Sequence, residues 1–251
     1  MKAPLLAIEG LCKKFGSLVV SDDITLQVRS GELHALIGPN GAGKTTLINQ
    51  LSGMLGSDRG RIVFDGIDVT RLDLPGRVRL GLARSFQITS ILPDFTVVEN
   101  VAVAVQARSG SSFRFFAPVA FEAALNAAAA SALHRVGLSD RSSARAGSLS
   151  HGEKRLLELA IAIATAPRLL LLDEPLAGLG LEESKASIAL LHRLKSEFTI
   201  VLVEHDMDAV FDLADRISVL VDGRVIATGA PHDIQSDAAV RSAYLGDEAH
   251  L

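Results

Sequence analysis

The sequence has a single cysteine, Cys12, among its 251 residues. An internal disulfide is therefore impossible, which fits a reducing compartment without requiring one. No stretch contains about 18 consecutive apolar residues, so we expect no membrane-spanning helix. The apolar run within Met1–Gly10 is too short for a secretory signal peptide, and we expect none there.

The chain also lacks a strong charge of either sign. Its net charge is −4 and its pI is about 6.0, which gives no support to nucleic-acid binding. The mean hydropathy of +0.32 is high, and either buried parallel strands or an apolar surface for a membrane-protein partner would account for it. Four arginines form a local basic run that we interpret as a solvated face, namely Arg71, Arg77, Arg79 and Arg84.

What the sequence does contain is a glycine-rich segment that fits the pattern G-x-x-x-x-G-K-[ST], the phosphate-binding P-loop. Its glycines permit close backbone approaches, so the N–H groups of the loop can form a concave nest for an anion. Lys44 adds a positive charge for the β- and γ-phosphates of a nucleotide, and Thr45 adds a hydroxyl for Mg²⁺. The predicted phosphate-binding residues are Gly38, Pro39, Asn40, Gly41, Ala42, Gly43, Lys44, Thr45 and Thr46.

The segments on either side of this loop have the pattern that a P-loop requires. Leu33–Ile37 predicts a short buried strand, and Thr45–Leu51 predicts a helix that ends at Gly53. A strand, a glycine loop and a helix N-terminus together form the arrangement that binds phosphate. A chance match in a glycine-rich turn is the alternative, and the two flanks count against it.

The remaining patterns predict one large α/β domain. We expect a turn at Leu11–Gly16 and hairpins at Asp65-Gly66 and Asp222-Gly223. Beyond Pro231 we expect short helices with polar turns. The expected strands are Leu5–Gly10, Ile24–Val28, Leu169–Leu172 and Thr199–Val203, and a helix is expected over 182–195.

Between residues 97 and 149 the sequence changes to helix formers, above all in the alanine-rich stretch Phe121–Leu133. Gly110–Ser112 interrupts this region and predicts a loop. We interpret the region as a helical subdomain inserted into the α/β core. The alternative is that these helices simply cover the sheet.

Two carboxylates, Asp173 and Glu174, end the strand Leu169–Leu172. Ligands of open α/β sheets bind beyond the carboxyl ends of the strands, where the P-loop also places its phosphates. Asp173 would hold Mg²⁺ together with Thr45, and Glu174 would orient or deprotonate the attacking water. By themselves the two carboxylates could equally be solvated turn residues.

Two further polar residues occupy comparable positions. His205 ends the next strand, which is predicted to neighbour that of Asp173, so we expect it near the γ-phosphate rather than in a purely structural role. Gln87 lies at the entry to the helical region, and its amide could bind Mg²⁺ or a water. Taken alone, Gln87 would be an ordinary polar surface residue.

A capped helix start is predicted at Leu149–Glu153. Ser150 is a favourable N-cap residue and Glu153 falls at the third helical position, which is the pattern of a capping box. This segment is either simply a well-capped helix or an anion-binding helix N-terminus with a serine hydroxyl.

In this order, the motifs make the chain similar to the ATP-binding subunits of ABC transporters along nearly its whole length. The matching positions are the aromatic Phe15, Walker A at Gly38–Thr45, the Q-loop residue Gln87, the signature Leu149–Glu153, Walker B ending at Asp173-Glu174, the D-loop Leu176–Gly180 and the switch histidine His205.

The resemblance implies a P-loop NTPase (RecA-like) core with an antiparallel β subdomain, at 1–88 and 167–251, and an inserted α-helical subdomain at 89–166. It implies ATP and Mg²⁺ as cofactors, and a head-to-tail homodimer or a heterodimer with a paralogous subunit. This dimer would drive transmembrane permease subunits from the cytoplasmic face of the membrane, with a periplasmic substrate-binding protein as an indirect partner. The implied roles are adenine stacking for Phe15, catalysis for Lys44, Glu174 and His205, Mg²⁺ binding for Thr45, Gln87 and Asp173, and ATP contact across the dimer for Ser150, His151, Gly152 and Glu153.

Within this family the chain most resembles subunits of importers for branched-chain or other hydrophobic amino acids. Two positions depart from the family pattern, because His151 replaces a signature glycine and Gly180 replaces a D-loop aspartate. The alternatives are an exporter subunit of the lipopolysaccharide type and a soluble ABC ATPase acting on DNA or ribosomes. A P-loop kinase would leave the signature unexplained. The stretches that carry the importer resemblance are Ala83–Gln87, Leu149–Arg155, Asp173–Gly178, Val203–Met207 and Ala243–Gly246.

Overall fold

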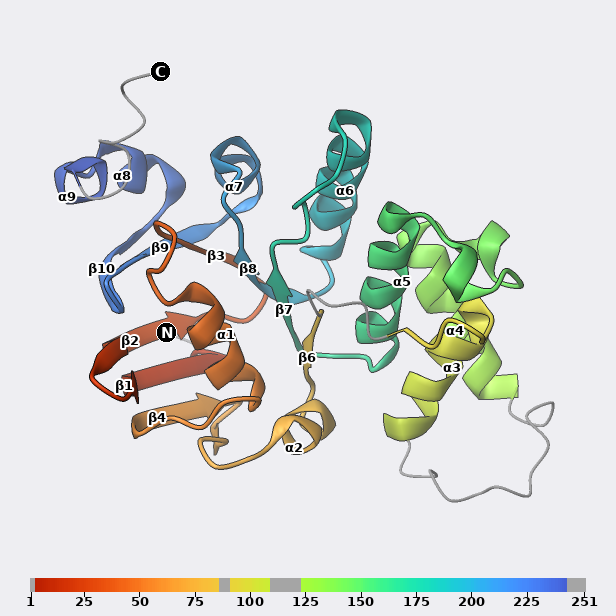
Figure 1. The fold of residues 1–251 in the computed structure, drawn as a ribbon, viewed down its shortest axis with the longest axis horizontal. Helices are drawn as coiled ribbons and strands as arrows, with labels where there is room; N and C mark the ends of the chain where they lie inside the picture. Colours follow the sequence, from red (N-terminus) through yellow and green to blue (C-terminus); the bar gives the residue numbers. More distant parts are fainter. Residues whose placement is uncertain (1–2, 86–90, 109–122, 243–251) are drawn as a thin grey trace.

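The structure is a computed structural model that describes residues 3–85, 91–108 and 123–242. The predicted Q-loop residue Gln87, the Gly110–Ser112 loop and the segment Ala243–Gly246 lie outside these residues. The described strands form two sheets, one with four strands and one with six. Figure 1 shows the larger sheet between the smaller sheet and a group of helices.

The smaller sheet is antiparallel and has the strand order β2-β1-β4-β5. The expected turn at Leu11–Gly16 is wrong, because the first strand continues through it and the turn lies at Gly16-Ser17. Register shifts in the β1–β2 ladder accommodate the irregular stretch, which is the behaviour of β-bulges. The strands are β1 (Leu6–Phe15), β2 (Leu18–Val28), β4 (Arg59–Phe64) and β5 (Ile67–Asp68).

The larger sheet has the order β10-β9-β3-β8-β7-β6, parallel throughout except for the edge strand β10. Every residue of β3, β7 and β8 is buried, as expected for parallel strands covered on both faces. Both predicted Asp-Gly hairpins are present. The strands are β3 (Leu33–Ile37), β6 (Leu82–Arg84), β7 (Leu169–Asp173), β8 (Thr199–Val203), β9 (Arg216–Val221) and β10 (Arg224–Gly229).

Helices cover the larger sheet on both faces. The described helices are α1 (Lys44–Ser52), α2 (Leu74–Arg79), α3 (Val97–Arg108), α4 (Ala123–Val136), α5 (His151–Ala164), α6 (Leu181–Leu194), α7 (Met207–Leu213), α8 (Pro231–Ser236) and α9 (Ala238–Val240). None of them is long and apolar enough to cross a membrane.

Alternate residues of the central strands enter two separate cores. Leu169 and Leu171 pack with α1 and the antiparallel sheet, so that α1 lies between the two sheets. Leu170 and Leu172 face the other way, into the core that α5, α6 and α7 share with α3 and α4. In Figure 1, α5 lies between the large sheet and the outer pair α3 and α4. The subdomain boundaries at 88/89 and 166/167 remain a prediction.

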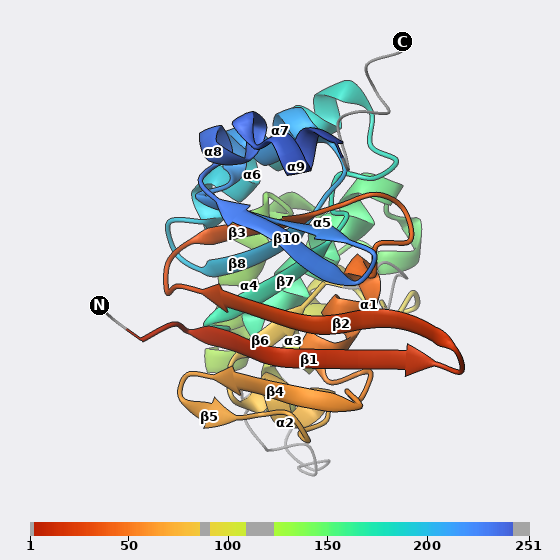
Figure 2. The same cartoon turned by 90° about the vertical axis from the view of Figure 1, so that its left-hand side faces the viewer.

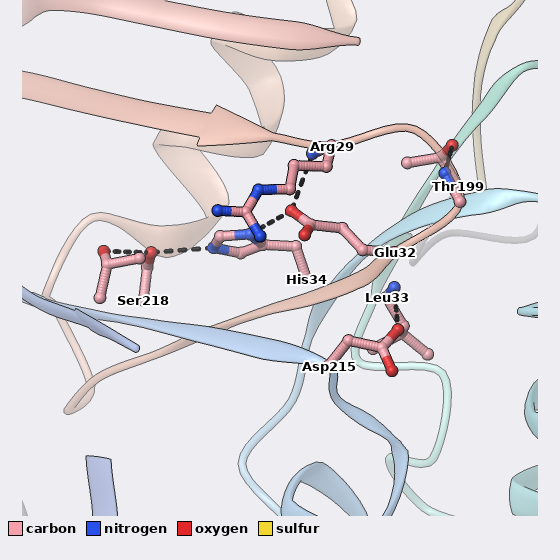
Figure 3. A network of polar contacts seen from close by, with 9 residues as sticks. Arg29, Glu32, Leu33, His34, Thr199, Asp215 and Ser218 are labelled. Atoms are coloured by element: carbon pink, nitrogen blue, oxygen red, sulfur yellow. Dashed lines mark hydrogen bonds and ion pairs between the residues drawn. The ribbon is translucent and has the colours of Figure 1, made fainter. Parts of the chain in front are cut away.

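A buried polar network fixes the amino-terminal end of β3, as Figure 3 shows. His34 is fully buried and donates from Nδ1 to Glu32 Oε1 over 3.1 Å, because a carboxylate can only accept. Its Nε2 lies 2.8 Å from the hydroxyl of Ser218 on β9, which in turn lies 2.7 Å from the hydroxyl of Thr228 on β10. The strand that leads into the P-loop is thereby tied to its neighbours.

Candidate nucleotide-binding site

The predicted site residues lie at the carboxyl ends of three adjacent parallel strands, at positions that pair with one another. Leu36 of β3 pairs with Val203 of β8, and Val203 pairs with Asp173 of β7. The P-loop (residues 38–46), Glu174 and His205 therefore all follow the carboxyl ends of neighbouring parallel strands, on the same side of the sheet. The prediction that the strand of His205 neighbours that of Asp173 is confirmed.

Lys44 lies folded into the P-loop. Its ammonium donates hydrogen bonds to the carbonyl oxygens of Gly38, over 2.6 Å, and Pro39, over 3.0 Å. The residue is only 8% exposed, and this burial lowers the pKa of Lys44, while the nearby carboxylates of Glu174 and Asp173 act in the opposite direction. A cation held in this position can meet an anion at the start of α1.

Two P-loop glycines are required by close backbone contacts. A Cβ on Gly38 would lie 2.0 Å from the carbonyl oxygen of Leu220, and a Cβ on Gly43 would lie 2.5 Å from that of Val20. Gly43 also has a φ of +101° and is the N-cap of α1, where no side chain caps the helix. The first N–H groups of α1 are thus available to a ligand.

Backbone hydrogen bonds join the P-loop to both sheets. Gly223, in the β9–β10 turn, donates its N–H to the carbonyl of Ala42 over 3.0 Å. The carbonyl of Gly223 accepts from the N–H of Asp22 on β2 over 2.8 Å. β2 and β10, which belong to different sheets, contact each other, and Figure 2 shows both facing the viewer. The shape of the loop is therefore set by elements far from it in the sequence.

Asp173 forms a buried ion pair that the sequence did not predict. Arg84 Nη2 donates to Asp173 Oδ2 over 3.0 Å, and the two side chains are 5% and 0% exposed. Burial raises the pKa of Asp173, while the charge of Arg84 acts to lower it. Asp173 Oδ1 is buried and has no hydrogen-bond partner among the described residues.

The available oxygens fit a Mg²⁺ ion. Mg²⁺ prefers oxygen ligands and takes one or two carboxylates together with phosphates and waters. Asp173 Oδ1 is a buried anionic oxygen without a partner in the described chain, and Thr45 offers an exposed hydroxyl at the start of α1. Gln87, the third predicted ligand, lies outside the described residues.

Glu174 has an unusual backbone that is held from both sides. Its φ of +50° is rare for a residue with a side chain, and such strain often occurs at functional sites. Its N–H donates to the carbonyl of Val203 over 2.8 Å. Its carbonyl accepts from Arg155 Nη1 over 2.9 Å. The backbone from which the predicted catalytic carboxylate projects is thus fixed by β8 and α5.

Glu204 joins the loops that follow β7 and β8. Its carboxylate is buried and accepts from the N–H of Leu176 over 2.7 Å and from the N–H of His205 over 3.0 Å. The side chain of His205 itself is 61% exposed. Glu204 therefore holds the backbone while leaving the imidazole of His205 accessible to a ligand.

The predicted capping box at the start of α5 is present. Ser150 Oγ accepts from the N–H of Glu153 over 3.2 Å, and the Glu153 carboxylate accepts from the N–H of Ser150 over 2.8 Å. Ser150 and His151 are exposed. No hydrogen bond or ion pair between Leu149–Glu153 and the P-loop occurs in the described part of the chain.

Phe15 is the last residue of β1 and is 50% exposed. The ammonium of Lys13 lies 5.6 Å from the centre of its ring. Phe15 pairs with Leu18, two residues before Val20, whose carbonyl lies against Gly43. The exposed aromatic ring is therefore at a hairpin tip close to the P-loop.

The basic run from Arg71 to Arg84 is only partly a solvated face. Arg71 and Arg79 are exposed, but Arg77 and Arg84 are buried, which corrects the interpretation for these two residues. Sequence reasoning also missed Asn49, Arg155 and Glu204. A signal existed for Asn49, since it lies four residues after Thr45 and thus on the same face of the predicted helix.

Comparison with known proteins agrees with this geometry. The family model of the ABC transporter matches residues 21–177, and a model of the branched-chain amino acid ATP-binding cassette transporter matches residues 224–250. The chain is 38% identical to the high-affinity branched-chain amino acid transport ATP-binding protein LivG of Salmonella typhimurium and of Escherichia coli K12, and equally to BraF of Pseudomonas aeruginosa. Each alignment covers 98% of this chain and 100% of the relative.

Solved structures show the same fold. MJ1267, an ATP-binding cassette of an ABC transporter, matches with a TM-score of 0.85 at 29% identity, over 97% of this chain and 99% of that one. The ADP conformation of MJ1267 matches with a TM-score of 0.84 at 28% identity, over 98% and 100%. The predicted fold class is confirmed. The chain belongs to the ABC transporter family of ATP-binding cassette proteins.

Proposed function

We propose that this chain binds ATP and Mg²⁺ at the P-loop and hydrolyses ATP to drive uptake of branched-chain or other hydrophobic amino acids through a membrane permease. The main support is the strand pairing of Leu36 with Val203 and of Val203 with Asp173. The P-loop, His205 and Glu174 come directly after these paired strand ends and therefore begin side by side. The transported class is inferred from the names of the LivG and BraF relatives.

ATP would lie with its phosphates against the P-loop. The loop N–H groups and Lys44 would bind the phosphates, and Phe15 would stack on the adenine. When bound, Mg²⁺ would neutralise charge on the β- and γ-phosphate oxygens. Thr45 and Asp173 would hold the ion, together with Gln87.

Hydrolysis requires a water aligned with the γ-phosphate. Glu174 would orient this water and accept its proton, because its carboxylate follows directly after the residue proposed to hold the metal. His205, whose side chain is largely exposed, would donate a hydrogen bond to the γ-phosphate. The lysine and the loop amides would stabilise the charge on the transferred group.

A second copy or a paralogous subunit would complete each site. Ser150, His151, Gly152 and Glu153 make no hydrogen bond to the P-loop of their own described chain, and Ser150 is exposed at a helix N-terminus. A head-to-tail dimer would bring this end of α5 to the ATP of the partner subunit. Leu181, which follows the D-loop, is 73% exposed and is available for the same interface.

The dimer would act on permease subunits at the cytoplasmic face of the membrane, with a substrate-binding protein as an indirect partner. Three apolar side chains of the helical region are exposed and offer a surface for such a contact, namely Leu92, Phe95 and Val103. An apolar surface of this kind is consistent with docking on a membrane protein.

Glu174→Gln tests the catalytic part of this proposal. The neutral amide cannot accept a proton, so we expect ATP binding to persist while turnover falls by about 100-fold or more. Without hydrolysis, the ATP-bound dimer should accumulate and be visible in size-exclusion chromatography with light scattering. Hydrolysis at the parental rate would show that Glu174 is not the catalytic base.

The transported class needs a separate experiment. The chain would be reconstituted in vesicles with its permease and binding-protein partners, and ATP-dependent uptake of labelled leucine and labelled glutamate would be compared. We expect uptake of leucine only. Intact ATP hydrolysis without uptake of any branched-chain amino acid would refute the substrate assignment while leaving the ATPase assignment standing.

A further inference from the structure

The two oxygens of the Asp173 carboxylate have different surroundings. Oδ2 accepts a hydrogen bond from Arg84 Nη2 over 3.0 Å. Oδ1 is buried and has no hydrogen-bond partner among the described residues. A buried carboxylate with one oxygen neutralised and the other without a partner can still bind a cation through the second oxygen.

Arg84 donates to Asp173 Oδ2 from Nη2, while its other terminal nitrogen is engaged elsewhere. Nη1 donates to Asn49 Oδ1 on α1, and it also lies 3.3 Å from Ser52 Oγ. Guanidinium groups commonly bind carboxylates with two parallel hydrogen bonds, which here would occupy Oδ1 as well as Oδ2. The contact with Asn49 directs Nη1 toward α1 and away from a second, parallel hydrogen bond to Oδ1.

The positions of these residues follow from the fold. Arg84 ends β6, which pairs in parallel with β7, so its side chain lies beside the carboxyl end of β7. α1 packs against both strands. Thr45 and Asn49 are four residues apart on α1 and share one face of the helix. That face carries both the proposed metal hydroxyl and the acceptor that holds Arg84.

We propose that Arg84, held by Asn49, is a positioning residue that fixes Asp173 through Oδ2 and keeps Oδ1 available for the divalent cation. This inference rests on the proposed ATP–Mg²⁺ function. It assigns a role to two residues that need not touch nucleotide or metal. A merely structural ion pair would stabilise the fold but would not affect metal binding more than nucleotide binding.

The test measures metal binding directly. Mn²⁺ would be titrated into the full-length protein saturated with ADP, and free Mn²⁺ would be followed by electron paramagnetic resonance. Nucleotide affinity in EDTA would be measured in parallel for each variant. The variants are Asn49→Ala and Arg84→Lys, and Arg79→Lys is the matched control because Arg79 belongs to the same basic run but is exposed.

We expect both variants to weaken Mn²⁺ binding by about 10-fold or more, which is the usual effect of removing a residue that orients a metal ligand. In Asn49→Ala, Nη1 loses its closest acceptor and keeps longer contacts, such as that with Ser52, so it can turn to Oδ1 and compete with the ion. Nucleotide affinity in EDTA should change by less than about twofold, since no phosphate-binding group is altered. The Arg79→Lys control should bind Mn²⁺ like the parent.

Two results would overturn the inference. One is Mn²⁺ affinity equal to the parent in the Asn49→Ala variant, which keeps both members of the ion pair and therefore remains informative even if Arg84→Lys does not fold. The other is an equal loss of nucleotide affinity in EDTA, which would indicate general damage to the site. If the parent protein bound no nucleotide, the proposed function itself would fail, and this outcome is distinct from both.

Discussion

Arg155 of α5 donates a hydrogen bond to the backbone carbonyl of Glu174 over 2.9 Å. The same arginine lies four residues after His151 and donates from Nε to His151 Nε2 over 3.2 Å. One side chain thus connects the start of α5, the segment proposed to contact ATP in the partner subunit, with the proposed catalytic glutamate of its own subunit.

Replacing Arg155 should therefore impair catalysis more than binding. A hydrogen bond from a charged donor contributes about 1.5–3 kcal/mol, so we expect Arg155→Met to lower kcat roughly tenfold through a less ordered Glu174. The affinity for ATP should stay within about twofold of the parent, because the P-loop is unchanged. Steady-state ATPase assays and equilibrium binding of ATP would separate the two effects. A loss confined to ATP affinity would contradict this role.

Lys44→Met should have the opposite profile. The substitution removes the charge proposed for the phosphates and leaves the carbonyls of Gly38 and Pro39 without their donor. We expect ATP affinity to fall at least about 10-fold, equivalent to about 1.4 kcal/mol. Isothermal titration calorimetry would measure this loss, with the exposed Lys185→Met as control. Unchanged ATP affinity in Lys44→Met would contradict the proposal that the P-loop binds the phosphates.

The motifs of this site could be predicted because each is local in the sequence. The strand, the glycine loop and the helix around Gly38–Thr46 follow one another directly, and the predicted strands that end near Asp173 and His205 are short apolar runs. Parallel pairing then brings their carboxyl ends together. The capping box at Ser150 is likewise contained within a few residues.

The buried arginines could not be predicted, because their burial depends on pairing between distant segments. Arg84 becomes buried only when β6 pairs with β7. Its ion-pair partner on β7, Asp173, lies 89 residues later in the chain. The turn expected at Leu11–Gly16 failed for a similar reason, since β1 is extended there by its ladders with β2 and β4. Side-chain composition alone does not carry this information.

Arg77 provides a stability prediction from the same correction. It is 1% exposed, and burial lowers its pKa to about 10, so it remains charged at neutral pH. Its Nη1 donates to the carbonyls of Gln50 and Leu51, each over 2.7 Å, at the end of α1. Carbonyls at a helix C-terminus lack partners within the helix and favour a positive charge.

Arg77→Met should therefore remove the charged donor from both carbonyls, of which that of Gln50 keeps, among the described residues, only the N–H of Gly53 at 3.3 Å. We expect the free energy of unfolding to fall by about 3 kcal/mol. Urea unfolding of the full chain would measure it. Arg79→Met, an exposed change two residues away, should stay within about 0.5 kcal/mol of the parent. Equal stability of the two variants would show that Arg77 does not support α1.

Glu32 carries the last prediction, which concerns pH. Burial by itself would raise the pKa of Glu32, but the hydrogen bonds from His34 and from the N–H of Arg29 outweigh it and hold the pKa below its ordinary value of 4.5. The folded state therefore prefers the carboxylate. Its contribution to stability is complete above about pH 4.5 and is lost as the pH falls through the folded-state pKa.

In the Glu32→Gln variant, the amide at position 32 does not titrate, so this pH-dependent contribution to stability should be absent. At pH 7 the variant should unfold with a free energy about 1–2 kcal/mol below that of the parent, since it keeps the shape of the side chain but loses the charged acceptor. The difference should shrink as the pH falls below about 4.5 and through the folded-state pKa of Glu32, because the parent then loses its charged acceptor too. Urea unfolding at a series of pH values, with the exposed Glu182→Gln as control, would measure the gap. A gap that stayed constant over this range would mean that the network in Figure 3 does not depend on the charge of Glu32.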